Sequence, residues 1–271
     1  MSTLGLDPVS ATLVLILVGL VAGTINTLAG GGSLITLPAL IFLGLPPGVA
    51  NATNRVGILL QSTAAVIGLA RGGALSLAGR TVAPEPDSGF PSEPVEGRAL
   101  LPRVLAACAG AAAGASLAAQ LEAGAFRRVI AVAMLVMLAV LLAKPKRWLH
   151  PRPAQPLPVQ AVGFFVIGAY GGFLQAGVGI FLLAGATWLA GEDLARGNVS
   201  KNLLVAAFTV PTLAVFLAEG LVAPGPGLAL AVGSTAGGFL GARLVGRLGA
   251  GFVRAVLVGV VSVAAVRLLL F

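Results

Sequence analysis

The chain contains few charged residues. Asp, Glu, Lys and Arg make up only 10% of its 271 residues, against about 25% in an average soluble protein. Hydrophobic residues make up 58%. This balance excludes an ordinary soluble domain and predicts an all-α polytopic membrane protein. The first residues lack the basic region of a cleavable signal peptide, so we expect the first apolar segment to be retained.

Cysteine and histidine are almost absent, with one of each. The single Cys108 excludes an intramolecular disulfide and, lying among alanines, is expected to be a packing residue. The sequence has no Ser/His/Asp set, no cluster of metal-binding residues and no nucleotide-binding loop. We therefore expect no enzymatic activity, no metal and no cofactor. The net charge is +8, but the basic residues are dispersed along the chain. We therefore expect them to determine the membrane topology and not to bind nucleic acid.

Acidic residues are missing from the interior of the apolar segments. All nine lie in loops or near segment ends. A cation pump or a proton relay normally places a carboxylate inside the membrane. The absence argues against a cation substrate and against proton coupling through a buried carboxylate.

Ten apolar segments can be counted along the chain. A full membrane crossing by a helix needs about 20 residues. Segments 33–43 and 178–190 are too short for a crossing and are predicted to be half-helices or re-entrant arms. The Pro-rich stretch 84–94 and the basic stretch 144–158 are predicted to lie outside the membrane. The segments are 9–29, 33–43, 48–70, 100–119, 125–143, 157–175, 178–190, 195–218, 225–243 and 250–270.

A glycine-rich run, NTLAGGGS at 26–33, interrupts the apolar stretch between residues 9 and 43. Irregular backbone at membrane depth is tolerated only where it is buried in protein or lines a cavity. A helix that restarts after the run would point its N-terminal N–H groups into that cavity. The run therefore predicts a binding site that includes Asn26, Gly30, Gly31, Gly32 and Ser33.

The two halves of the chain resemble each other. A shift of 147 residues overlays 23–73 on 170–220 and matches Gly30 with Gly177, Gly32 with Gly179, Gly44 with Gly191, Asn51 with Asn198 and Gly73 with Gly220. We interpret 1–143 and 159–271 as repeats joined by a basic cytoplasmic linker, 144–158. Each repeat would hold a Gly-broken helix, a half-helix and three transmembrane helices. The alternative is a chance match between Gly-rich helices. GAAAG at 110–114 and GSTAG at 233–237 predict close helix packing.

The distribution of lysine and arginine predicts that the repeats are inverted. If each half crosses the membrane an odd number of times and the N-terminus is outside, 13 cations lie inside and 3 outside (Arg127, Arg128 and Arg267), with Arg55 left aside. If each half crosses four times, the split is about 9 against 7. The positive-inside rule favours the first arrangement, which many secondary transporters share.

Polar residues near the start of two equivalent helices predict an anion site. The first helix carries Asn51, Asn54 and Arg55, and the second carries Asn198, Lys201 and Asn202. Residues three or four apart share a helix face, and cations with amide donors stabilise an anion. Gln175, Gly177 and Gly179 mark the second break. As alternatives, Arg55 and Lys201 would snorkel to the interface, and Asn51 and Asn198 would cap or join helices.

These residues resemble the TauE/SafE family of sulfite exporters. The resemblance lies in GTINTLAGGGSLITLP at 23–38 and GVANATNR at 48–55, and in the second half in GGFLQAGVG at 171–179 and GNVSKN at 197–202. It covers nearly the whole chain. It implies a multi-pass protein of the bacterial inner membrane that exports sulfite, sulfoacetate or a related small anion.

The sequence and the resemblance together predict a secondary transporter of a small oxyanion that works by alternating access. An anion channel with the same cationic lining is the alternative, and an intramembrane scaffold is a further one. The expected partners are the anionic substrate and the lipid bilayer.

Overall fold

The computed structural model describes residues 7–76, 93–143, 150–244, 255, 257–264 and 267. Arg80, Lys146 and most of the Pro-rich stretch lie outside these residues. The described chain is helical apart from loops and one short parallel strand pair, β1 (Leu75–Ser76) and β2 (Val95–Glu96). The helices are α1 (Pro8–Ala29), α2 (Ser33–Phe42), α3 (Pro47–Arg71), the 3-10 helix η1 (Gly97–Leu100), α4 (Leu101–Ala119), α5 (Ala123–Ala143), α6 (Leu157–Leu174), α7 (Val178–Trp188), α8 (Leu194–Ala218) and α9 (Pro224–Leu244). Residues 257–264 are also helical.

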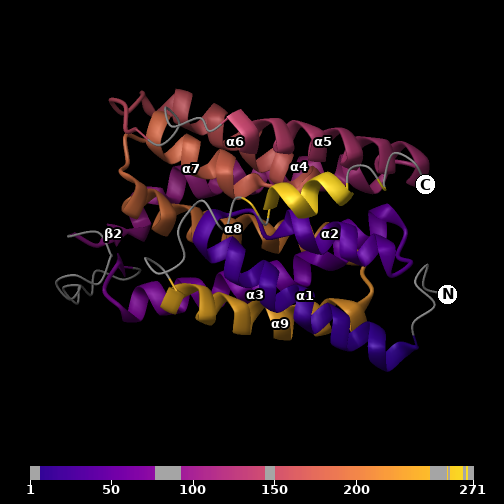
Figure 1. The fold of residues 1–271 in the computed structure, drawn as a ribbon. Coiled ribbons are helices and arrows are strands. Elements are labelled where there is room, and N and C mark those ends of the chain that lie inside the picture. Colours follow the sequence, from indigo (N-terminus) through magenta and orange to yellow (C-terminus); the bar gives the residue numbers. More distant parts are fainter. Residues whose placement is uncertain are drawn as a thin grey trace.

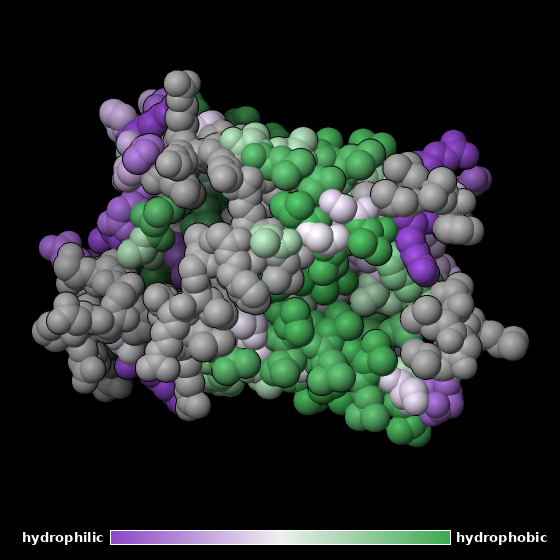
Figure 2. Space-filling view, in the orientation of Figure 1, coloured by the Kyte–Doolittle hydropathy of each residue, from purple (hydrophilic) through white to green (hydrophobic). Residues whose placement is uncertain are grey.

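The all-α membrane fold is confirmed. Helices α1 to α9 begin and end within about two residues of the predicted apolar segments. Among the described residues, five helical stretches are long and apolar enough to cross a membrane, while α2 and α7 are short apolar helices of 10 and 11 residues. Figure 2 shows a broad apolar surface between two polar ends, as expected for a protein surrounded by lipid.

Local sequence fixes the start of α1. The Asp7 carboxylate accepts hydrogen bonds from the Ser10 hydroxyl at 2.6 Å and from the backbone N–H groups of Ser10 and Val9 at 3.1 Å each. These bonds lower the pKa of Asp7, because they stabilise the charged form. Asp7 is therefore the N-cap of α1, and Pro8 occupies the first helical position, where no N–H is needed.

The two halves of the chain interlock. Helix α1 packs along α9, and α4 packs along α6, so the first helix of each half lies on the fourth helix of the other. Helices α3 and α8 contact each other between these pairs (Figure 1). Glycines allow the close approach: a Cβ on Gly110 or Gly114 would collide with backbone oxygens of α6, and one on Gly233 or Gly237 with backbone oxygens of α1. The close packing predicted from these two motifs is confirmed.

The half-helices α2 and α7 end at opposite ends of the molecule. The end of α2 shares a pocket with Ala123, at the start of α5. Beyond the end of α7, Leu189 accepts a hydrogen bond from Gln155, just before α6, and Glu192 contacts Arg103, at the start of α4. Since α5 follows the end of α4, these are opposite ends. In Figure 1, α7 lies toward the side of β2 and α2 toward the side marked N.

Backbone conformation repeats at the spacing of 147 residues. Six glycines of the described chain have a positive φ, and they form three pairs at that spacing: Gly30 (74°) with Gly177 (73°), Gly44 (99°) with Gly191 (70°), and Gly73 (78°) with Gly220 (65°). Glycine adopts such angles without the strain that a side chain imposes. The equivalent turns of the two halves therefore share backbone geometry as well as sequence.

Candidate functional site

The break between α1 and α2 is built around Asn26. Gly30 ends α1 in a left-handed conformation, with its N–H donated to the Asn26 carbonyl at 2.8 Å. The Asn26 side-chain oxygen accepts the Gly32 N–H at 3.4 Å. No side chain caps the start of α2 at Ser33. The N–H groups of Leu34 and Ile35 donate to the Gly31 and Gly32 carbonyls at 3.1 and 3.0 Å, and the positive end of the helix dipole still favours an anion here.

Gly32 is required for packing. A Cβ at this position would lie 2.5 Å from the Ala22 carbonyl oxygen and 2.7 Å from the Asn26 Cβ. The atoms nearest to a Cβ on Gly31 would instead be those of the Leu257 side chain, at 3.0 Å. The two glycines that the sequence placed in one binding motif therefore differ, because Gly32 holds α2 against α1 and Gly31 faces a side chain that can move.

A small polar cavity lies beside the start of α2. It is enclosed by α1, α2, α3 and α9 and has a volume of about 10 Å³, enough for about one water molecule. Its polar lining comprises Asn26, Gly32, Ser33, Thr36, Asn54, Gln61 and Ser234, with Ala22, Ile58 and Leu230 as apolar walls. None of the described lining residues carries a carboxylate.

The cavity brings together some of the predicted site residues and adds others. Asn26, Gly32, Ser33 and Asn54 come together as expected. Sequence reasoning missed Thr36, Gln61 and Ser234. Thr36 follows Ser33 by one helical turn and Gln61 follows Asn54 by two, so helical spacing could have indicated them. Ser234 is on α9 and carries no local sequence signal.

Hydrogen bonds inside the cavity leave several donors unused. Thr36 Oγ1 donates to Asn54 Oδ1 at 2.7 Å, so this bond uses the amide oxygen of Asn54 and leaves its N–H groups available. Gln61 Nε2 donates to the Gly23 carbonyl at 3.1 Å. Within the described residues, Asn54 Nδ2, Asn26 Nδ2 and the Ser33 hydroxyl have no hydrogen-bond partner. Amide and hydroxyl donors of this kind suit the oxygens of an anion.

The second half has no polar counterpart to this cavity. At the spacing of 147 residues, Asn26 corresponds to Phe173, Ser33 to Ile180, Thr36 to Leu183 and Gln61 to Phe208. Phe208 is fully buried and would contact a Cβ on Gly171. Only Lys201, which corresponds to Asn54, is polar. The two halves share a backbone plan, but only the first carries a polar set at this place.

Arg55 lies inside the protein, against the end of α6. Its side chain has no solvent exposure. Nη1 donates to the Gly171 carbonyl and to Gln175 Oε1 at 2.5 Å each, and Nη2 donates to the Gly172 carbonyl at 2.9 Å. The snorkelling alternative is therefore wrong for Arg55. A cation here is stabilised by the negative end of the α6 dipole.

Asn51 and Asn54 point in different directions, although their spacing predicted a shared face. Asn51 Nδ2 donates to the Phe173 carbonyl at 2.9 Å, and its oxygen accepts from Arg55 Nη2 at 3.3 Å. Asn54 instead faces α2 through Thr36. The predicted single constellation is thus divided: Asn51, Arg55 and Gln175 join α3 to α6, while Asn54 lines the polar cavity.

Lys201 is a buried cation with a single hydrogen bond. Its side chain is 3% exposed, and Nζ donates to Asn198 Oδ1 at 2.7 Å. Asn202 Nδ2 donates to the Asn198 carbonyl at 2.8 Å, within α8. In the part of the chain that the structure describes, the one ion pair joins Arg103 and Glu192. Lys201 therefore has no acidic partner among these residues.

The two breaks contact each other through their glycines. Gly177 directly precedes α7, while Gly30 ends α1, three residues before α2. A Cβ on Gly30 would lie 3.1 Å from the Gly179 Cα. This contact brings the two breaks together.

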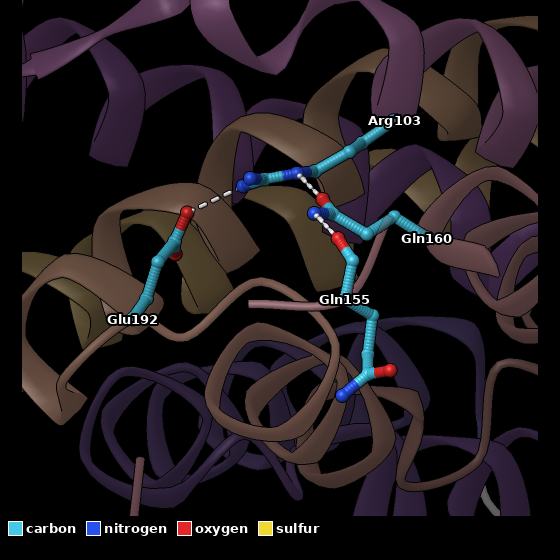
Figure 3. A network of polar contacts seen from close by, with 4 residues as sticks. All are labelled: Arg103, Gln155, Gln160 and Glu192. Carbon is cyan, nitrogen blue, oxygen red and sulfur yellow. Dashed lines mark hydrogen bonds and ion pairs between the residues drawn. The ribbon is translucent and has the colours of Figure 1, made fainter. Parts of the chain in front are cut away.

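A separate polar network joins Arg103, Gln160, Gln155 and Glu192 (Figure 3). Arg103 Nη1 lies 2.5 Å from Glu192 Oε1, and Arg103 Nε donates to Gln160 Oε1 at 2.7 Å. Gln160 Nε2 in turn donates to the Gln155 carbonyl at 2.7 Å. This network connects α4, α6 and the loop between α7 and α8. Sequence reasoning assigned it no role.

Comparisons with known proteins agree with this architecture. The model of the family described as sulfite exporter TauE/SafE matches residues 15–84 and 90–268. The chain is 28% identical over 219 residues to the probable membrane transporter protein YfcA of Escherichia coli K12, covering 80% of this chain and 74% of that protein. It is 28% identical over 212 residues to the probable membrane transporter protein ORF9 of a Sinorhizobium species, covering 78% and 74%. No solved structure gives a significant match. The family match spans most of the chain, which therefore belongs to the TauE/SafE sulfite exporter family.

Proposed function

We propose that this membrane protein is a secondary transporter of a small oxyanion, sulfite or an organosulfonate such as sulfoacetate. The binding site is the polar cavity at the start of α2. The observation that carries the proposal is a set of unused donors, on Asn26, Ser33 and Asn54, beside an uncapped helix start. Such donors stabilise the oxygens of an anion, and the cavity lining has no carboxylate to oppose it.

The charge balance of the interior supports an anionic substrate. Arg55 and Lys201 are both buried. Arg55 is neutralised only partly, by the end of α6, and Lys201 has one neutral partner. Buried charge is costly until an opposite charge compensates it. A bound anion would supply that compensation, while a cation would add to the repulsion.

The size of the cavity supports a mechanism with a conformational change. At about 10 Å³ the cavity is too small for a sulfite ion. The helices that line it must separate before the anion can enter. Rocking of one half against the other, about the contact between the two breaks, is the motion that inverted repeats typically use. An anion channel would instead hold a continuous path open.

We also propose that the halves are inverted repeats. The support is the opposite direction of α2 and α7 and the three pairs of left-handed glycines. The loops around Arg80 and Lys146 would then be cytoplasmic, with both termini outside. Single cysteines at 80, 146 and 124 in a Cys108→Ala background test this by labelling from each side. Labelling of 80 and 146 from opposite sides would contradict the inverted arrangement.

Sulfite counterflow in proteoliposomes tests the transport function and the site. Saturable counterflow is expected for the parent protein, and large unitary currents would favour the channel. A matched pair of substitutions tests the cavity. Ser33→Ala removes a free hydroxyl, whereas Ser62→Ala removes a hydroxyl that donates at 2.6 Å to the Ile58 carbonyl of its own helix. A hydrogen bond to a charged group contributes about 1.5–3 kcal/mol.

We therefore expect Ser33→Ala to weaken sulfite binding by roughly tenfold to a hundredfold and Ser62→Ala to leave it unchanged. Asn54→Leu should abolish counterflow, because it removes an amide and fills the cavity. Counterflow that persists unchanged in both Ser33→Ala and Asn54→Leu would place the binding site elsewhere.

A further inference from the structure

A second and larger pocket lies at the end of α2 that is remote from the polar cavity. Its volume is about 670 Å³. Its walls are the last turn of α2 and the loop to α3, residues 41–47, together with the start of α5 and Arg267. The α2–α3 loop contributes Leu45 and Pro46, and Pro47 begins α3, so much of the wall is rigid and apolar.

The polar groups of this pocket are two arginines. Arg127 lines it from the first turns of α5, and its Nε is buried without a hydrogen-bond partner. The Arg267 guanidinium lies 6.0 Å from the centre of the Phe42 ring, over one wall. Within the described part of the chain, no acidic residue lines the pocket. Among the described residues, neither arginine forms an ion pair.

The position of the pocket connects it to the polar cavity. Helix α2 begins at the cavity, with Ser33, and ends at the pocket, with Phe42. Its ten residues span about 15 Å. The Arg103–Glu192 network lies at the opposite end of the molecule. The pocket and the cavity thus lie at the two ends of one half-helix, away from that network.

We propose that this pocket is a second anion site, in which Arg127 and Arg267 hold an oxyanion group at the mouth of the route to the cavity. Guanidinium groups bind such oxygens through paired, charge-assisted hydrogen bonds. The apolar walls reduce the screening of these bonds by water. The inference rests on the proposed function in one respect, since the oxyanion group would be that of the transported ion. The same chemistry would also hold the phosphate of an anionic lipid, and the volume admits either group.

The first experiment measures sulfite uptake into liposomes of phosphatidylcholine, which supplies no anionic lipid. Arg127→Gln and Arg267→Gln are expected to lower uptake at subsaturating sulfite by about tenfold, with little change at saturation. Arg128→Gln is the matched control, because Arg128 is the next residue on α5, is exposed, and does not line the pocket. Arg127→Lys keeps the charge and should recover part of the loss.

The second experiment measures retention of phosphatidylglycerol by the purified protein in native mass spectrometry. Loss of retained lipid in Arg127→Gln and Arg267→Gln, but not in Arg128→Gln, identifies the lipid phosphate as the bound group. An effect on uptake alone identifies the transported anion. The proposal is overturned if both pocket variants match the parent in both experiments, or if Arg128→Gln has the same effect as they do.

The experiments on the pocket and those on the cavity can fail independently. If Ser33→Ala and Asn54→Leu leave uptake unchanged while Arg127→Gln lowers it, the cavity assignment fails and the second site stands. If the cavity variants lose uptake and the pocket variants change neither uptake nor lipid retention, only the second site fails.

Discussion

The backbone of Gly30 lies directly against the backbone of Gly179. A Cβ on Gly179 would be 2.6 Å from the Gly30 carbonyl oxygen and 2.8 Å from its Cα. Gly30 ends α1 and Gly179 lies in the first turn of α7, so this contact joins the breaks of the two halves. A motion of one half against the other must be accommodated at this contact.

Gly179→Ala is expected to destabilise the protein, because the added methyl group meets backbone atoms, which cannot rotate away. Overpacking of this kind costs about 1–3 kcal/mol. Gly68→Ala on α3 is the control, since nothing lies within 4 Å of a Cβ there, and alanine favours the helix by about 0.5–1 kcal/mol. Thermal unfolding in detergent measures both. Equal unfolding temperatures for Gly179→Ala and the parent would contradict the close contact.

Arg55→Gln is expected to reduce stability more than it reduces anion affinity. The substitution leaves the Gly171 and Gly172 carbonyls and Gln175 without their donor in a buried place. Each unsatisfied group costs about 1–3 kcal/mol, so a loss of about 3 kcal/mol or more is expected. Arg55→Lys should recover less than half of it, because an ammonium group cannot reach the same set of oxygens. Denaturation measurements and sulfite binding on the same samples separate the two effects.

The helices were predictable from the sequence because lipid imposes a strong pattern. Each crossing needs a long apolar run, and the exceptions, α2 and α7, were recognised by their length. The left-handed glycines were also within reach, since Gly30 and Gly177 share a break motif and a spacing. The length of each apolar run and the local glycine motif determine these features.

The grouping of polar side chains was only partly predictable, because it depends on which helix covers each face. Asn51 and Asn54 are three residues apart, yet one contacts α6 and the other α2. Ser234 reaches the cavity because α9 packs on α1 and α3. Nothing in the sequence around Ser234 indicates that packing. Arg55 and Lys201 also differ in their partners because different helices cover them. Arg55 contacts the end of α6, whereas Lys201 contacts Asn198 of its own helix.

Lys201→Met is expected to reduce anion affinity without reducing stability, which is the opposite of the effect expected for Arg55→Gln. It removes a buried cation whose single hydrogen bond goes to Asn198 and replaces it with an apolar side chain of similar length. Because an unpaired buried charge is costly, the unfolding temperature should stay the same or rise. If the Lys201 charge stabilises the bound anion, sulfite affinity should fall by roughly tenfold or more. A loss of stability with unchanged affinity would show that Lys201 is structural.

The Arg103–Glu192 pair is expected to hold the end of the molecule near β2 closed. Both side chains are largely buried, at 16% and 10% exposure, and Arg103 Nε is oriented by Gln160. Arg103→Glu places two carboxylates together and should destabilise the contact between α4 and the loop that precedes α8. The double variant Arg103→Glu with Glu192→Arg restores opposite charges and should recover part of the stability, although the Gln160 bond is lost. Labelling of a cysteine at Ala190, which is buried in the loop between α7 and Glu192, should be faster in Arg103→Glu than in the parent and should slow again in the double variant. If the double variant is labelled as fast as Arg103→Glu, the pair does not control access at this end.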